Sequence, residues 1–125
     1  MKALLLSAGY GSRLKPYTNK SPKCLIEINN RPLLDYWLHA LFSSGIKEIL
    51  INTHYLSQKV EKFVKSSKFS NKIKLVREKK LLGTAGTIRQ NIDFFENSDF
   101  FVAHSDNLCI CDFKAFFICL FFKAC

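Results

Sequence analysis

A glycine-rich stretch near the amino terminus carries residues suited to holding an anion. Residues 7–18 read SAGYGSRLKPYT and follow the apolar run ALLL at 3–6. Gly9 and Gly11 allow backbone angles closed to other residues and let main-chain N–H groups approach a ligand closely. Arg13 adds a planar cation that suits phosphate oxygens. We predict a phosphate-binding loop here; a tight turn with only a structural role is the alternative.

Two charged residues elsewhere could act on the same ligand. Pro22 fixes the backbone just before Lys23 in SPKCLIEI, so the Lys23 ammonium could be held toward a phosphate. Asp106 in VAHSDNL follows an apolar run, and its carboxylate suits a hard cation such as Mg2+ bridging phosphates. An ordinary surface lysine and a turn or cap aspartate are the alternatives. His104 is expected to pack beside the strand rather than to act as a base.

A second glycine-bearing stretch, REKKLLGTAGTI at 77–88, leads from a predicted strand into a predicted helix. Gly83 and Gly86 flank Thr84 and Ala85, so the backbone could lie flat against a planar base. N–H groups at the helix start would add positive potential. A helix-capping role for Thr84 is the alternative. The spacing of the glycines around Gly11 and the lack of a Gly-Lys-Ser/Thr ending exclude the dinucleotide fingerprint and the P-loop.

The apolar pattern predicts strands that alternate with helices. Strands are expected at 2–7, 46–52, 73–77 and 99–103, and helices at 32–42, 57–67 and 86–95. Such alternation is typical of an α/β, Rossmann-like, three-layer αβα fold with a mostly parallel sheet. Ligands bind such sheets at the carboxyl ends of the strands, and the glycine loop, the REKKLLGTAGTI stretch and Asp106 follow predicted strands.

Composition narrows the class of protein and its partners. The chain has 125 residues, 48% of them hydrophobic and 23% charged, which suits a single globular domain. Its formal charge is +9, and many of its positive residues lie in a lysine-rich block at 59–80. This block is best explained as the solvated face of a helix. Arginines do not interleave with aromatic residues in that block as they do in base-stacking surfaces, so no nucleic-acid partner is predicted.

Membrane insertion and secretion are not indicated either. No apolar run approaches the roughly 20 residues of a membrane span, and no secretory signal is recognisable. The five cysteines include no Cys-x-x-Cys pair, so a reducing, cytoplasmic location is expected.

The carboxyl-terminal residues break the alternating pattern. FFICLFFKAC at 116–125 is nearly all apolar, and a helix that is apolar all round must be buried. We therefore expect residues 1–116 to form the nucleotide-binding part of a domain and residues 117–125 to be an aberrant extension. A helix tucked under the sheet is the alternative.

Taken together, the four stretches resemble the sugar-1-phosphate nucleotidylyltransferases. Their pattern is a Gly-x-Gly-Thr/Ser-Arg-Leu-x-Pro-x-Thr loop, a Pro-Lys-x-Leu segment, a Gly-Thr-Ala-Gly stretch and a metal-binding aspartate. The resemblance covers residues 1 to about 116, which correspond to the first half of the family's catalytic domain. It implies an incomplete nucleotide-diphospho-sugar transferase fold. LLGTAG is most similar to the mannose-1-phosphate guanylyltransferase branch.

The resemblance implies that a nucleoside triphosphate, with GTP favoured, and a sugar 1-phosphate give a nucleotide sugar and pyrophosphate. The nucleotide would then be held by Leu6, Ala8, Gly9, Gly11, Ser12, Gly83 and Thr84. Arg13 would stabilise the leaving pyrophosphate, Lys23 would meet the α-phosphate, and Asp106 would bind Mg2+.

The chain also departs from the family pattern. Ser105 stands where relatives often have glycine before the metal-binding aspartate. The family's second metal-binding aspartate and most sugar-contacting residues lie beyond residue 125. We therefore expect a truncated, weakly active or inactive transferase whose exposed sheet edge favours self-association. A nucleotide-binding or regulatory module without catalysis is the alternative.

Overall fold

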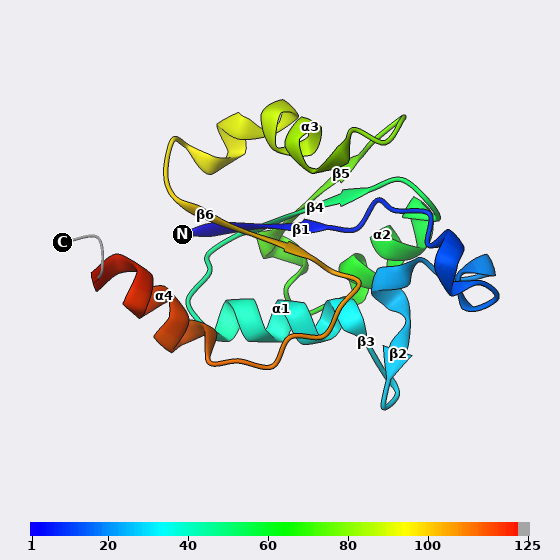
Figure 1. Ribbon diagram of the computed structural model, residues 1–125, viewed down its shortest axis with the longest axis horizontal. Helices are drawn as coiled ribbons and strands as arrows, with labels where there is room; N and C mark the ends of the chain where they lie inside the picture. The colour runs from blue at the N-terminus through cyan, green and yellow to red at the C-terminus, as the bar shows by residue number, and fades with distance from the viewer. Residues whose placement is uncertain (123–125) are drawn as a thin grey trace.

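A four-stranded parallel sheet forms the centre of the computed structural model, which describes residues 1–122 (Figure 1). The spatial order is β5-β4-β1-β6. These strands are β1 (Lys2–Leu6), β4 (Ile49–Thr53), β5 (Ile73–Arg77) and β6 (Phe100–His104). All three pairings are parallel, which confirms the predicted α/β architecture.

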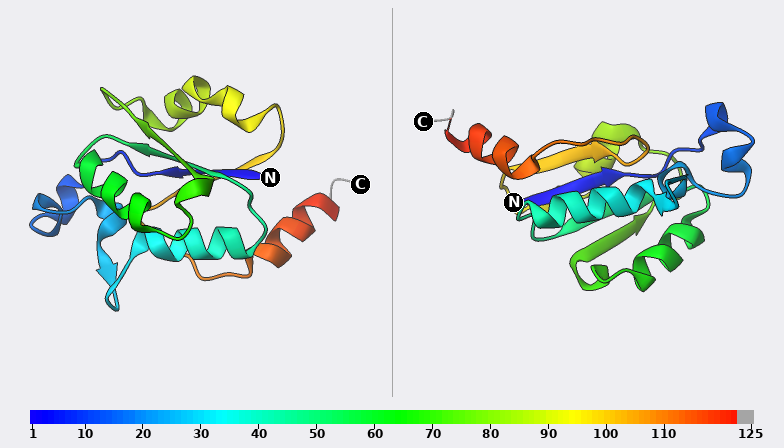
Figure 2. Two further views of the ribbon diagram at one scale, coloured as in Figure 1. Left: turned by 180° about the vertical axis from the view of Figure 1, so that it is seen from behind. Right: turned by 90° about the horizontal axis from the view of Figure 1, so that it is seen from below.

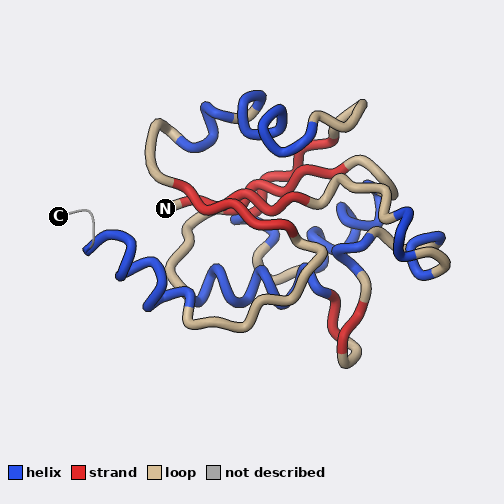
Figure 3. The backbone as a smooth tube through the Cα atoms, viewed as in Figure 1, coloured by secondary structure: helices blue, strands red, loops and turns tan. Residues whose placement is uncertain are grey.

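Helices cover both faces of the sheet (Figure 2). One face carries α1 (Leu33–Ser43), α2 (Ser57–Ser66) and α4 (Phe113–Phe122), and the other carries α3 (Gly83–Gln90). A small antiparallel hairpin, β2 (Glu27–Ile28) with β3 (Arg31–Pro32), projects ahead of α1. The tube in Figure 3 shows the sheet between these helical layers.

The central strand β1 explains why the sheet needs both layers. Ala3 and Leu5 pack into the core beneath α1, whereas Leu4 and Leu6 pack into the core beneath α3. Successive side chains of a strand point to opposite faces, so a strand covered on both sides has to be apolar at every position. The run ALLL is therefore the signature of this central position.

Several predicted boundaries are wrong by a few residues. The third helix begins at Gly83 rather than Gly86 and ends at Gln90, followed by a separate 3-10 turn over Ile92–Phe95. The Asn91 side chain donates to the Thr87 carbonyl at 2.9 Å, and this local bond competes with continuation of the helix. The second strand begins at Ile49 because the Ile46 N–H is used to close the end of α1.

The helix α4 crosses the boundary predicted at residue 117. Phe113 and Phe117 are buried against the sheet, whereas Phe116, Ile118 and Leu120 are exposed. This one-sided burial is the packing expected of the alternative, a helix beneath the sheet. Residues 123–125 lie outside the described residues, and the origin of residues 117–125 stays a prediction. Within residues 1–122, no helix has both the length and the apolar character to cross a membrane.

The smaller core beneath α3 offers a test of the fold. Phe95 is 1% exposed and stacks on Phe100 with ring centroids 3.8 Å apart. Phe95→Ala should lower the free energy of unfolding by about 3–5 kcal/mol, because it leaves a cavity in a packed core. Ile92→Ala is the matched control, since Ile92 lies in the same 3-10 turn but is 46% exposed. Urea unfolding followed by circular dichroism measures both; equal losses would contradict the assigned core.

Candidate functional site

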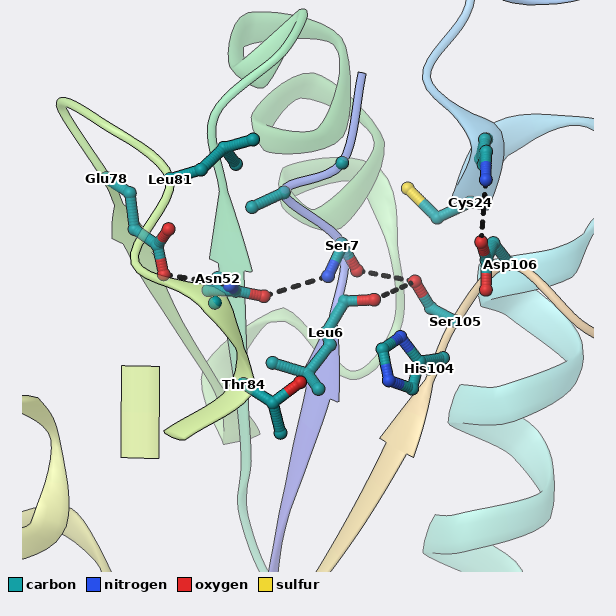
Figure 4. Close-up of a pocket in the computed structure, with 14 residues that line it drawn as sticks. Leu6, Ser7, Cys24, Asn52, Glu78, Leu81, Thr84, His104, Ser105 and Asp106 are labelled. Atoms are coloured by element: carbon teal, nitrogen blue, oxygen red, sulfur yellow. Dashed lines mark hydrogen bonds and ion pairs between the residues drawn. The ribbon is translucent and has the colours of Figure 1, made fainter. Parts of the chain in front are cut away.

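A cavity of about 220 Å3 opens at the carboxyl ends of β1, β4 and β6 (Figure 4). It brings together parts of all four chemical stretches. The predicted residues that line it are Leu6, Ala8, Gly9, Lys23, Gly83, Thr84 and Asp106. The parallel sheet produces this convergence, because the carboxyl ends of its strands meet at one edge.

Three predicted residues do not line the cavity. Gly11, Ser12 and Arg13 belong to the adjoining loop, where Ser12–Leu14 form a 3-10 turn and Arg13 is exposed. Among the described residues, Arg13 makes no ion pair within 4.0 Å. The loop therefore presents Arg13 to solvent, four residues along the chain from the last lining residue of this stretch, Gly9.

The two loop positions Gly9 and Gly11 differ in whether they need glycine. Gly11 has φ +71°, and a Cβ there would lie 2.7 Å from Thr18 Cγ2 and 2.9 Å from Lys23 Cγ. Only glycine suits this position. Gly9 has no positive φ, and a Cβ there would meet nothing within 4 Å. The expectation that Gly9 needs an unusual backbone angle is therefore wrong.

Lys23 and Asp106 form an ion pair at the cavity wall. Lys23 Nζ donates to Asp106 Oδ2 at 3.0 Å, with side chains 20% and 34% exposed. Lys23 comes from a 3-10 turn over Lys23–Leu25, and Asp106 lies just after β6. The pair places one positive and one negative group side by side at the edge of the cavity, where Figure 4 labels Asp106.

A buried hydrogen-bond network forms the opposite wall. The Ser7 N–H donates to Asn52 Oδ1 at 2.8 Å, and Asn52 Nδ2 donates to Glu78 Oε1 at 2.9 Å. Glu78 is 5% exposed and also accepts from the Leu82 N–H at 3.1 Å and from the Thr87 hydroxyl. A buried carboxylate is stable only when such donors surround it.

Sequence reasoning missed Glu78 and Asn52 as site residues. Glu78 directly follows β5, as Asp106 follows β6 closely, so the rule that selected Asp106 could have selected Glu78. Asn52 gave no such signal, because it lies inside the apolar run of β4. A polar residue within a buried strand was the clue to an internal hydrogen bond.

Ser105 and Ser7 join the ends of β6 and β1. The two hydroxyl oxygens lie 2.6 Å apart, and the Ser105 hydroxyl donates to the Leu6 carbonyl at 3.0 Å. Ser105 is fully buried. The departure from glycine at this position thus adds two hydrogen bonds that hold the segment preceding Asp106.

Three further residues that line the cavity are His104, Thr84 and Cys24. His104 is exposed and lines the cavity, which corrects the expectation that it packs beside the strand. Among the described residues, the Thr84 side chain makes no capping hydrogen bond, and the N-cap residue of α3 is Leu82 rather than Thr84. Cys24 also lines the cavity, and burial raises the pKa of its thiol to about 12.

The donors present suit a divalent cation only as part of a larger set. The described residues contain no cluster of three or more His, Cys, Asp or Glu side chains that could hold a metal. Both oxygens of Glu78 already accept hydrogen bonds, whereas Asp106 Oδ1 makes none among the described residues. Mg2+ commonly takes one or two carboxylates together with substrate phosphates and water. Asp106 fits that role as a single protein ligand.

The family model described as nucleotidyl transferase matches residues 2–119. A mannose-1-phosphate guanylyltransferase catalytic subunit beta from Xenopus tropicalis is 40% identical over 117 residues, covering 90% of this chain and 32% of that protein. Mannose-1-phosphate guanyltransferase from Saccharomyces cerevisiae is 36% identical over 118 residues, covering 91% and 33%. The chain thus spans about a third of the length of these relatives.

Solved structures are also similar to this chain in fold. A putative glucose-1-phosphate thymidylyltransferase from Bacillus anthracis has a TM-score of 0.86 at 26% identity, covering 98% of this chain and 50% of its own. HddC from Yersinia pseudotuberculosis complexed with GMP-PN has a TM-score of 0.79 at 27% identity, covering 94% and 53%. The described fold thus corresponds to about half of each of these chains.

The glycine loop provides a test of the site's local architecture. Gly11→Ala should destabilise the fold by about 1–3 kcal/mol, because it combines a left-handed backbone with a clash against Thr18. Gly9→Ala is the matched control and should stay within about 0.5 kcal/mol of the wild type, because its Cβ meets open space. Chemical unfolding of both variants measures the difference; the reverse order would refute the loop conformation.

Proposed function

The chain belongs to the nucleotidyl transferase family, and from this membership we propose that its cavity holds the nucleoside triphosphate for transfer to a sugar 1-phosphate. GTP is the favoured nucleotide. The observation that carries the proposal is the Lys23–Asp106 pair beside a cavity at the carboxyl ends of parallel strands. A phosphate chain needs cations and main-chain N–H groups, and both lie beside this cavity.

The proposed reaction is an in-line substitution at phosphorus. An oxygen of the sugar phosphate attacks the α-phosphorus, the bond to the bridging oxygen of the β-phosphate breaks, and pyrophosphate leaves. Positioning and charge stabilisation supply most of the catalysis in such reactions. Lys23 would neutralise the α-phosphate, and Arg13 in the adjoining loop would stabilise the pyrophosphate.

Mg2+ is part of the same proposal. A bound Mg2+ would offset negative charge on the phosphates. Asp106 would be its ligand from this chain, because its Oδ1 is free of hydrogen bonds from the described residues. Lys23 Nζ donates to the other oxygen, Oδ2, and so fixes the orientation of this carboxylate in the wall of the cavity.

The wall formed by Glu78 supports guanine over the other bases. A carboxylate only accepts hydrogen bonds, Glu78 lines the cavity, and its Oε2 accepts only the Leu82 N–H among the described residues, so this oxygen can accept from a further donor. Guanine presents the adjacent donors N1–H and N2–H2. Uracil and thymine flank their one donor with carbonyl oxygens, which a carboxylate would repel. The guanylyltransferase relatives are consistent with this preference.

We further propose that these 125 residues alone turn over weakly. The relatives that carry the named activity are about three times as long, and Asp106 is the one proposed metal ligand among the described residues. One carboxylate should hold a metal more weakly than two. The same observation favours a second candidate function, a nucleotide-binding module without catalysis. A pyrophosphate-release assay with GTP and mannose 1-phosphate would distinguish this module from a weak transferase.

The free thiols Cys24, Cys109, Cys111 and Cys119 suit a reducing, cytoplasmic setting.

Nucleotide binding tests the proposed function directly. Isothermal titration with GTP, dTTP, UTP and CTP, each with Mg2+, should show a preference for GTP. Lys23→Ala and Arg13→Ala should each weaken binding roughly 10- to 100-fold, as expected for a lost charge-assisted contact. Lys65→Ala is the control, because Lys65 is an exposed lysine of α2 paired with Glu61. A folded wild-type protein that binds none of the nucleotides would refute the proposal.

The base preference has its own test. Glu78→Gln keeps the shape of the side chain but replaces an acceptor by a donor, so GTP affinity should fall roughly tenfold while UTP affinity changes little. Glu61→Gln, at an exposed position of α2, is the control. Thermal unfolding checks that the network around Glu78 survives. An unchanged GTP preference would remove the guanine assignment and leave triphosphate binding intact.

A further inference from the structure

Two thiols meet in the segment between β6 and α4. Cys109 and Cys111 are both exposed and free, and Cys109 Sγ donates to Cys111 Sγ at 3.9 Å. Ile110 between them is 89% exposed, so this part of the segment stands out in solvent. Access to an attacking thiolate or to a small disulfide is a requirement for thiol–disulfide exchange.

The segment is anchored on both sides of the thiols. Trp37 Nε1 donates to the Asn107 carbonyl at 2.9 Å, which ties the start of the segment to α1. Asp112 Oδ1 accepts from the Ala115 N–H at 2.9 Å, which caps the start of α4. The anchors limit how far the two cysteines can separate, while the exposed residues between the anchors can adjust.

We propose that Cys109 and Cys111 form a reversible redox site that closes to a disulfide with glutathione disulfide as the oxidant. One thiolate attacks a sulfur of glutathione disulfide, forms a mixed disulfide and releases one glutathione. The second thiolate then attacks the protein sulfur, forms the Cys109–Cys111 bond and releases the second glutathione. The two protein thiol protons end on the two glutathione thiols, so atoms and electrons balance.

The position of the pair makes it reversible. A ring closed by a single intervening residue is strained, and strained, exposed disulfides are the easily reduced ones. Cys24 cannot compete, because it is only 1% exposed and a disulfide in solution cannot reach it. Cys119 is exposed on α4, and no other described thiol lies within hydrogen-bond distance of it, so it should take up a glutathione instead.

Mass spectrometry of the full chain tests the site. The reduced protein is equilibrated with mixtures of glutathione and glutathione disulfide, alkylated with N-ethylmaleimide and digested with trypsin. Residues 90–114 form one tryptic peptide that contains both cysteines, whereas Cys119 falls in the next peptide. We expect the first peptide to lose two hydrogens, to carry no alkyl group, and to recover two alkylatable thiols after dithiothreitol.

Single variants complete the test. Cys109→Ser and Cys111→Ser should each abolish the loss of two hydrogens and yield a stable glutathione adduct at the remaining cysteine. Cys119→Ser should retain the closure, and all three changes lie on exposed side chains, so the fold should persist. Separate glutathione adducts or alkyl groups on Cys109 and Cys111, under conditions that modify Cys119 fully, would overturn the proposal. So would a closure that requires Cys119.

Discussion

The burial of β1 on both faces is the constraint on which the site depends. Its residues pack beneath α1 and α3 at once, and its two neighbours are β4 and β6. A strand held in this way resists a shift of register, because a slip of one residue would exchange Ala3 and Leu5 with Leu4 and Leu6 between two close-packed cores. The ends of the three strands are therefore fixed relative to one another, and the cavity is built on those ends.

Hydrogen bonds between the ends of the strands then fix the positions of the side chains at the site. Ser7 bonds to Asn52 at the end of β4 and to Ser105 at the end of β6. Asp106 follows Ser105 directly and in turn holds Lys23. A buried network of this kind tolerates little displacement, because each lost bond would leave a polar group unpaired in a low-dielectric interior. The charged pair beside the cavity is therefore held by neutral groups beneath it.

The architecture and much of the site followed from the sequence, whereas the side-chain network did not. Apolar periodicity marked the strands, and the strand-end rule placed Asp106 and the glycine loop at one edge of the sheet, whereas Lys23 was singled out by the proline before it. Gly9 and Gly11 looked alike in the sequence, but of the two only Gly11 has a positive φ, and only there would a Cβ clash with Thr18 and Lys23. The sequence marked Asn52 only as a polar residue within a buried strand, because its hydrogen-bond partners come from distant parts of the chain.

The two outer strands of the sheet show how differently its edges are protected. In β5, Lys74 and Arg77 are exposed and positively charged, and such charges discourage pairing with another strand. The sequence of β6, FFVAH, has no lysine, arginine or proline. No strand among residues 1–122 pairs with its outer side, and its residue Phe101 lies against the aromatic side chains of α4. An apolar, uncharged edge is the less protected of the two, so self-association through the sheet, which stays a prediction, would involve β6 rather than β5.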